Sequence, residues 1–378
     1  GRAVSDAGAL EQETARRILG GLVRDISAAL DCVAHAARAV RLIGEEGHDA
    51  ALQQWAAAVQ TGPEFAWEAG GDAGGWRRLL LRLRKRAAVE VHLAQECFAP
   101  GSSSGALAEA AGDEDDWVKL TALAALSELD GDRAAVLAQL QALCGEHVGE
   151  QDYCEPIGRA AVGLFKAGVG DSVRLAEAAL SGPGIESRVE LTQQLLFVAQ
   201  EGDRADMLRA YLADRTVDDL PTLCLALALR GAGNTVEGLK MGTGAGEDVH
   251  REVPYARLAL RAMDNDSDAA QALEKMLREG DATERYYSAY YLILARVRSA
   301  LLVFSSVRDR DVPYMLRGLC AASLIRQGHP GGAGWFRVIF RSAEGGVKAR
   351  IHTHLSRAVE DTIPVMLECK DVNLGRFV

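Results

Sequence analysis

The chain has few aromatic residues and no long uncharged apolar run. Aromatics make up 6% of its 378 residues, which disfavours a β-sandwich, because strands favour branched and aromatic side chains. The best candidate for a membrane span, Tyr286 to Phe304, is interrupted by Arg296 and Arg298, whereas a span needs about 18 uninterrupted apolar residues. These absences, with abundant Ala and Leu of high helix propensity, predict an all-α fold without a membrane span.

Paired cysteines and an early methionine are also missing. The seven cysteines are scattered, odd in number and form no Cys-x-x-Cys motif, so we expect free thiols in the cytoplasm or another reducing intracellular compartment. The first methionine is Met207, and the start GRAVSDAGALEQ has no signal-peptide core. We therefore expect a trimmed or processed piece.

Positive charge is scarce overall but concentrated near the C-terminus. The 42 basic and 53 acidic residues give a net charge of −11, which argues against a molecule that binds polyanions over its whole surface. Residues 298–357 nevertheless hold ten Lys or Arg against three acids, a local +7 that leaves −18 for the rest. This basic C-terminal face is either a contact for nucleic acid, anionic lipid or an acidic protein, or a solvated surface balanced by acidic neighbours.

A two-residue corner recurs along the chain from about residue 112. Its copies are Gly131-Asp132, Gly170-Asp171, Gly202-Asp203, Gly233-Asn234, Asn265-Asp266 and Gly328-His329, spaced 39, 32, 31, 32 and 63 residues apart. Gly takes the left-handed conformation that ends a helix, and Asp or Asn accepts hydrogen bonds from the N–H groups that open the next helix. Each unit is then a helical hairpin. The last spacing is two periods, so the turn near Val297-Arg298, which lacks glycine, must be built differently.

The helix before the corner carries a second pattern. Val118-Lys119-x-x-Ala122-x-x-Ala125-Leu126 places a branched residue, a cation and small residues at regular spacing. This pattern resembles the second helix of HEAT and armadillo-type repeats. Looser copies are Leu316-Arg317-x-x-Cys320-x-x-Ser323-Leu324, Val347-Lys348-x-x-Ile351-x-x-His354-Leu355 and Arg285-x-x-Ser288-x-x-Tyr291-Leu292. The resemblance implies a right-handed α-solenoid in which stacked hairpins share one core.

The resemblance covers roughly residues 112–370. We therefore predict a helical N-terminal region over residues 1–105 and a HEAT-like α-solenoid of about eight hairpins over residues 106–378. Proteins similar to HEAT arrays serve as scaffolds, transport adaptors, phosphatase subunits, nucleic-acid binders and, occasionally, lyases or glycosylases, so the fold alone decides little about function.

Five residues are predicted to anchor a protein partner on the concave face. They are Tyr286, Tyr290, Arg317, Arg337 and Arg350. Aromatic and arginine side chains dominate interface energetics. Tyr286, Tyr287, Tyr290 and Tyr291 form one helical stripe, and burial of that stripe in the core is the competing interpretation.

A second set of cations is a candidate polyanion-binding surface. It comprises Arg77, Arg78, Arg82, Arg84, Lys85 and Arg86, the densest basic run in the chain. On a helix, Leu79, Leu80 and Leu83 make one side and the cations wrap the other, which suits either a phosphate backbone or a solvated face opposite a buried leucine stripe.

The repeat cations are open to two interpretations as well. Lys119, Arg159, Arg188, Arg257, Arg285, Arg317 and Lys348 form either a ladder for an acidic ligand or internal pairs with corner carboxylates such as Asp132, Asp171 and Asp203. The regular register favours the internal pairs.

Catalytic motifs are weak. Gly101-Ser-Ser103-Ser-Gly105 matches Gly-x-Ser-x-Gly, but a nucleophile elbow needs a preceding strand. Gly242-Thr-Gly244-Ala-Gly246 lacks the Gly-Lys-Ser/Thr ending of a phosphate loop. His352 and His354 point about 200° apart on a helix and cannot readily share a metal. We therefore predict no enzyme activity, no cofactor and no metal, and a scaffold or adaptor within a larger assembly, with a nucleic-acid-binding solenoid as the alternative.

Overall fold

The computed structural model describes most of the central part of the chain. It covers residues 73–129, 133–182, 185–213, 215–234, 240–241 and 251–297, with isolated positions at 30, 33–34, 37, 52–53, 56–57, 317, 320–321, 324, 329, 331–335 and 338. Of the two Tyr and three Arg predicted as partner anchors, Arg337 and Arg350 lie outside these residues, as do Lys348, His352 and His354.

The described residues are almost entirely α-helical, which confirms the predicted fold class for this part of the chain. The helices are α3 (Ala73–Phe98), α4 (Ser104–Ala111), α5 (Asp116–Leu126), α6 (Arg133–His147), the 3-10 turn η1 (Gln151–Tyr153), α7 (Cys154–Ala167), α8 (Ser172–Leu180), α9 (Ile185–Ala199), α10 (Arg204–Leu212), α11 (Leu220–Gly231), α12 (Val253–Met263), α13 (Ser267–Glu279) and α14 (Ala282–Ala295). Among them, none is long and apolar enough to cross a membrane.

Two very short strands depart from the all-helical expectation. β1 (Thr216–Val217) and β2 (Lys240–Met241) pair in parallel, with Thr216 opposite Lys240 and Val217 opposite Met241. Val217 is fully buried against the helical core. Strand β1 precedes α11 and β2 follows it, so the strand pair joins the two segments on either side of this helix.

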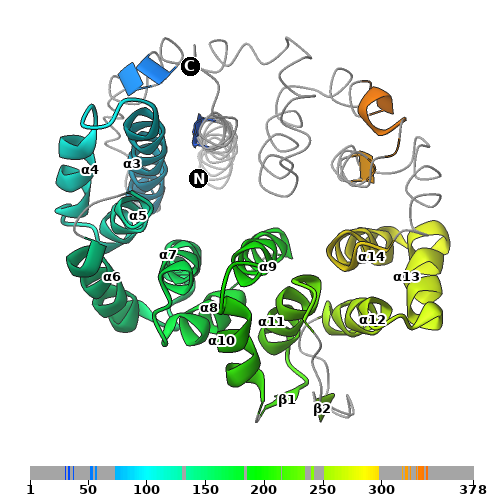
Figure 1. Ribbon diagram of the computed structural model, residues 1–378. Helices are drawn as coiled ribbons and strands as arrows, with labels where there is room; N and C mark the ends of the chain where they lie inside the picture. The colour runs from blue at the N-terminus through cyan, green and yellow to red at the C-terminus, as the bar shows by residue number, and fades with distance from the viewer. Residues whose placement is uncertain are drawn as a thin grey trace, which may run out of the picture.

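The described helices follow one another along an arc from α3 to α14 (Figure 1). Helices α3, α5, α7 and α9 lie on the inner side, and each packs on the next; α4, α6 and α8 lie on the outer side. At the far end α12 packs on α11, and α13 and α14 form a hairpin against α12. We call the surface formed by α3, α5, α7 and α9 the inner layer.

One apolar core joins the helices from α5 onward, and the buried residues of α3 and α4 form smaller separate clusters. Buried side chains extend without interruption from Leu120 in α5 to Leu324. In α13 the buried residues Ala269, Leu273 and Leu277 recur every four positions, which is the stripe that an amphipathic helix turns toward its neighbours. Because burying a Leu contributes about 1.5–3 kcal/mol, each hairpin depends on its neighbours to cover that stripe.

The N-terminal stretch joins the same stack. Val33, Ala34, Ala37 and Leu52 are buried against the α3 residues Ala87, Val91 and Ala94. On its other side, α3 packs on α4 and α5. The boundary proposed at residue 105 stays a prediction, and the packing of α3 resembles that of the later inner helices.

Three of the predicted corners have the expected left-handed residue. Gly202, Gly233 and Asn265 have φ of +57°, +86° and +66°. In the corner after α7, the left-handed residue is Gly168, with φ +81°, and not Gly170. Gly131, Asp132 and Gly328 lie outside the described residues.

The second residue of the corner caps a helix less often than predicted. Asp266 accepts hydrogen bonds from the N–H groups of Asp268 and Ala269, as expected. Asp171 and Asp203 cap nothing and instead pair with Arg174 and Arg204. An arginine in the first turn competes for the carboxylate that would otherwise accept the backbone N–H groups.

Aspartates outside the predicted corners cap other helices. Asp115, Asp219 and Asp281 cap α5, α11 and α14, and Asp281 forms a reciprocal capping box with Glu284. Each cap contributes about 0.5–2 kcal/mol. The end of the acidic run at Asp113 to Asp116 therefore starts a helix, with Asp115 as its cap and Asp116 as its first residue.

The glycine-free turn after α14 is built on an arginine. Arg296 ends α14 in the left-handed conformation, with φ +52° and ψ +38°. The N–H groups of Arg296 and Val297 donate to the carbonyls of Ile293 and Leu292. The expectation that this turn is built differently is confirmed.

Gly202 and Gly170 provide a matched test of the corner geometry. A Cβ at either position meets no heavy atom within 4 Å, and only Gly202 has a positive φ. We expect Gly202→Ala to lower the free energy of unfolding by about 1 kcal/mol through backbone strain. Gly170→Ala should change it by less than about 0.5 kcal/mol. Urea unfolding measures both, and equal losses would contradict the assignment of the corner.

Candidate functional site: an arginine-lined cavity

A cavity of about 280 Å³ opens within the inner layer. Its walls come from α3, α5, η1, α7, the end of α8 and α9, near the ends at which α5, α7 and α9 begin. Two glycines help to keep it open: a Cβ at Gly182 would lie 2.7 Å from Cβ of Cys154, and one at Gly158 would lie 3.2 Å from Leu191. The volume lies near the lower end of the range for ligand pockets, which suits one side chain or a small molecule.

Three arginines from three inner-layer helices line this cavity. Arg86 comes from α3, Arg159 from α7 and Arg188 from α9. The exposed fractions of their side chains are only 7%, 14% and 6%. A buried guanidinium needs a counter-charge, and each of the three has one.

Arg86 is paired with a carboxylate that is itself in solvent. Its Nη1 lies 2.8 Å from Oε1 of Glu155, and the Glu155 side chain is 48% exposed. Glu155 belongs to the first turn of α7, where negative charge is favoured by the helix dipole. This pair therefore joins a fixed buried cation to a partly solvated anion.

Arg159 is held from two sides. Its Nη1 donates to Oε1 of Glu90 at 2.5 Å, and Nη2 donates to Oε1 of Glu128 at 3.2 Å. Glu90 is 1% exposed and comes from α3. The contact ties α7 to α3 across the inner layer.

Arg188 forms the most deeply buried ion pair. Its Nε and Nη2 donate to the two carboxylate oxygens of Glu252, and Nη1 donates to the carbonyl of Gly182. The hydroxyl of Tyr291 donates to Oε2 of Glu252 at 3.2 Å. Burial raises the pKa of Tyr291 well above its ordinary value, which keeps this donor protonated.

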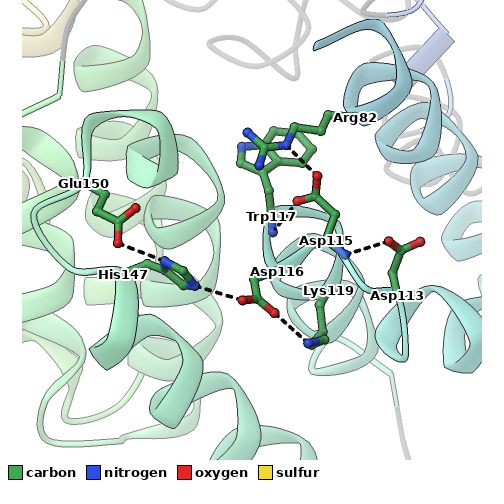
Figure 2. A network of polar contacts seen from close by, with 8 residues as sticks. All are labelled: Arg82, Asp113, Asp115, Asp116, Trp117, Lys119, His147 and Glu150. Carbon is green, nitrogen blue, oxygen red and sulfur yellow. Dashed lines mark hydrogen bonds and ion pairs between the residues drawn. The ribbon is translucent and has the colours of Figure 1, made fainter. Parts of the chain in front are cut away.

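An acidic loop and a basic helix meet beside the cavity (Figure 2). Asp115 accepts from Nε of Arg82 at 2.8 Å while also capping α5 through the N–H of Trp117. Asp113 pairs with Lys85 and accepts from the N–H of Asp115. The two segments neutralise each other at the contact between α3 and α5.

The same network continues to α6. Asp116 pairs with Lys119 at 2.6 Å, and Nε2 of His147 lies 3.2 Å from its other oxygen. Nδ1 of His147 lies 3.1 Å from Glu150, and the His147 ring stacks on Tyr153 at 4.0 Å. These contacts fix the connection between α6 and η1, which forms one edge of the cavity.

Two carboxyls in this network have lowered pKa values. For Asp113, burial raises the pKa, but hydrogen bonds from Lys85 and from the N–H of Asp115 outweigh it. For Asp116, the hydrogen bond from Lys119 lowers the pKa, burial opposes it, and His147 adds to the lowering. Both carboxyls therefore stabilise the folded state in their charged form.

The cavity contains no activated nucleophile among its lining residues. Cys154 is half-buried, and burial followed by the charge of Asp152 raises the pKa of its thiol. A catalytic cysteine needs the opposite shift, toward the thiolate. Within the described residues no cluster of His, Cys, Asp and Glu has the arrangement of a metal site.

The candidate polyanion-binding set is largely engaged within the protein. Arg82, Lys85 and Arg86 pair with Asp115, Asp113 and Glu155. Arg78 is exposed and Arg84 is half-buried, while the side chain of Arg77 lies outside the described residues.

The leucines of α3 depart from the predicted stripe. Leu80 is buried and Leu83 half-buried, but Leu79 and Leu81 are each 48% exposed. The helix is therefore not divided into one leucine side and one cation side, because the acidic run places its carboxylates on part of the basic surface.

The predicted tyrosine anchors occupy different environments. Tyr290 is 3% exposed and Tyr291 is fully buried, so the core interpretation holds for these two, and Tyr290 offers little surface to a partner. Tyr286 is half-buried and contacts Tyr287 and Tyr290 edge-on, with ring centroids 5.8 and 5.0 Å apart. Arg317 is helical and half-buried, and its binding role stays a prediction.

Five of the seven repeat cations have contacts within the described residues, as favoured, and these do not include the predicted partners Asp171 and Asp203. Lys119 pairs with Asp116 in its own helix, whereas Arg159 and Arg188 reach carboxylates 69 and 64 residues away. Arg257 and Arg285 donate to the backbone carbonyls of Asp218 and Gly280. Neither Asp171 nor Asp203 takes part. Glu90 and Glu252 had no signal in the sequence, because nothing in a repeat unit reports a contact across two units.

The Gly-x-Ser-x-Gly motif is a helix-to-helix turn. It follows α3, its last two residues begin α4, and the Glu96 carboxylate accepts from the N–H of Gly101 and of Ser103. The hydroxyl of Ser103 donates to Gln95. Helix α3, and not a strand, precedes the motif, and these hydrogen bonds hold the turn in place. Gly242, Gly244 and Gly246 lie outside the described residues.

Comparisons with known proteins found no match among family models, curated proteins or solved structures. The relation to HEAT and armadillo-type repeats therefore remains a prediction from the sequence pattern.

We expect removal of Glu252 alone to destabilise the protein much more than replacement of both Arg188 and Glu252. Glu252→Leu leaves a buried, unpaired guanidinium, so we expect a loss of about 3–5 kcal/mol in the free energy of unfolding. The double variant Arg188→Met with Glu252→Leu should recover most of that loss. Urea unfolding measures both, and a double variant no more stable than the single one would contradict a desolvated pair.

We expect part of the decrease in the free energy of unfolding at acid pH to come from Asp113 and Asp116. Because their pKa values are lowered by folding, their contribution is present above about pH 4 and is lost as the pH falls through the folded-state values. We expect Asp113→Asn with Asp116→Asn to lower stability by about 1 kcal/mol at pH 6 and to flatten the loss between pH 5 and pH 2. Parallel acid losses in variant and wild type, measured by urea unfolding, would count against this.

Proposed function

We propose that this chain is a HEAT-like α-solenoid that acts as a non-enzymatic scaffold or adaptor, and that it anchors a protein partner at the arginine-lined cavity of the inner layer. The observation that carries the proposal is the cavity itself, with three buried arginines from three inner-layer helices. Buried arginines surrounded by close packing are typical of interface hot spots.

The packing of the helices supports an elongated binding surface. Each inner-layer helix packs on the next, and one apolar core runs through successive hairpins. Nearest-neighbour packing of this kind favours an array whose inner side is long and whose shape is fixed by helix-to-helix contacts. Handedness and the number of hairpins stay predictions.

The chemistry of the cavity favours binding over catalysis. Its cations are matched by carboxylates, and its thiol, Cys154, has a raised pKa. Groups that are paired and held in place recognise a ligand through charge and shape, whereas catalysis needs a nucleophile with its base in reach.

The nucleic-acid alternative has less support. Arg82, Lys85 and Arg86 already hold carboxylates of the protein, so phosphate contacts there would have to displace them. The basic C-terminal face, including Arg337 and Arg350, lies outside the described residues and remains a prediction.

A paired tryptophan substitution tests the proposed function. Ser187 is exposed at the cavity, and Ala138 is exposed on the outer helix α6. Immobilised wild type, Ser187→Trp and Ala138→Trp are compared for the proteins they retain from nuclease-treated lysate. We expect a nuclease-resistant partner whose recovery falls at least about tenfold for Ser187→Trp only, because the indole fills the anchor site. Loss of the partner with nuclease, or equal recovery by all three proteins, would contradict the proposal.

A further inference from the structure

We propose that the cavity receives the carboxylate of a glutamate or aspartate side chain from the partner protein, and that Glu155 occupies that position on Arg86 while the cavity is empty. The inference rests on the proposed function and specifies the partner's chemistry. It starts from the unequal burial of the two members of the pair, 7% for Arg86 and 48% for Glu155.

Arg86 behaves as the fixed member of the pair. Its side chain is 7% exposed, whereas that of Glu155 is 48% exposed, so the guanidinium stays in the interior when Glu155 moves into solvent. A guanidinium held in this way presents N–H donors in a planar fork that matches two carboxylate oxygens.

Glu155 behaves as the exchangeable member. A half-exposed ion pair contributes only about 0–1 kcal/mol, and a Glu155 released from Arg86 stays in the first turn of α7, where the helix dipole still favours its charge. Releasing it therefore costs little. Arg159 and Arg188 differ from Arg86 because each also binds a deeply buried carboxylate, Glu90 or Glu252, at 1% and 5% exposure.

Charge balance favours a carboxylate over a phosphate. The lining holds Arg86, Arg159 and Arg188 together with Asp152 and Glu155, and further carboxylates stand behind the arginines. Because Glu155 stays at the cavity edge when it leaves Arg86, an incoming carboxylate adds one negative charge there. A phosphate dianion would add about two beside Asp152, at a site whose cations are already matched.

The remaining walls suit an acidic side chain. Pro156, Ala179 and Leu191 provide apolar surface for methylene groups, and the exposed Ser187 stands at the cavity with a hydroxyl. About 280 Å³ accommodates a side chain of that length.

The test uses the full chain and a defined probe. The probe is the peptide acetyl-Gly-Glu-Gly-amide, with acetyl-Gly-Gln-Gly-amide and inorganic phosphate as comparisons. Trp117 lines the cavity, so binding is followed by the fluorine NMR signal of 5-fluorotryptophan at position 117, assigned with Trp117→Phe. The variants are Glu155→Gln, Asp152→Asn, and Arg86→Gln with Glu155→Gln.

The expected result is specific to one position. Glu155→Gln should lower the Kd of the Glu peptide by about tenfold, because a neutral amide no longer competes from within the site at high effective concentration. Asp152→Asn removes the same charge from the same cavity without freeing Arg86 and should change the Kd by less than about twofold. The double variant, verified as folded by circular dichroism, should lose the gain, because the cation is gone.

Three results would overturn the proposal. They are an unchanged Kd in Glu155→Gln, equal binding of the Gln and Glu peptides, and phosphate binding to Glu155→Gln more tightly than the Glu peptide. The Ser187→Trp experiment tests the scaffold function separately from the carboxylate assignment. If Glu155→Gln binds the Glu peptide tenfold more tightly but Ser187→Trp loses no partner, the cavity binds acids and the scaffold function is wrong. If Ser187→Trp loses a partner but Glu155→Gln shows no gain, only the carboxylate assignment is wrong.

Discussion

The arrangement of the second half of the structure depends on a salt bridge that water does not reach. Arg188 and Glu252 are both 5% exposed, and removing two such ions from water costs several kcal/mol each unless every hydrogen-bonding position is used. Here they are used: Glu252 accepts from Arg188 and from Tyr291, and Arg188 also donates to the carbonyl of Gly182. These groups come from four places: α9, the start of α12, α14 and the end of α8. The hydrogen bonds among them therefore fix the spacing of these helices.

That constraint reaches the cavity through Arg188, which is part of its wall. The corresponding contact on the other side is Arg159 with Glu90, which fixes α7 relative to α3. A cavity in a close-packed interior normally shrinks as neighbouring side chains relax into it. Here its walls carry guanidiniums whose positions are fixed by buried partners, so collapse would require those ion pairs to break. The charges therefore keep the space open.

Local features of the fold were predictable because they depend on a few neighbouring residues. Gly202, Gly233 and Asn265 end helices in the left-handed conformation, which only small or amide side chains adopt easily. Gly170 was wrongly preferred to Gly168, because the sequence Gly-Val-Gly-Asp offers two glycines and the choice depends on which one continues the hydrogen bonds of α7. Arg296 shows the opposite case: tertiary packing imposes a left-handed residue where the sequence offers no glycine.

The candidate site was not predictable in the same way. The pattern that resembles HEAT repeats marked Arg159 and Arg188 as special, but their carboxylates lie 69 and 64 residues away in sequence. Tyr290 was predicted as a partner anchor, with burial as the competing interpretation, and it is buried. A helical stripe of tyrosines looks the same in sequence whether it meets solvent or another helix. Exposure at such positions is decided by the neighbouring unit, and the spacing within one unit contains no information about it.

The three cavity arginines are all held by carboxylates, but the burial of those carboxylates differs. Glu90 is more buried than Arg159, and Glu252 is as buried as Arg188. Arg86, at 7% exposure, contacts Glu155, which is 48% exposed. A buried cation attracts the strongest available anion, and a half-solvated carboxylate does not exhaust that attraction. The imbalance at this pair makes the cavity a site where an incoming acid competes on better terms than anywhere else on the inner layer.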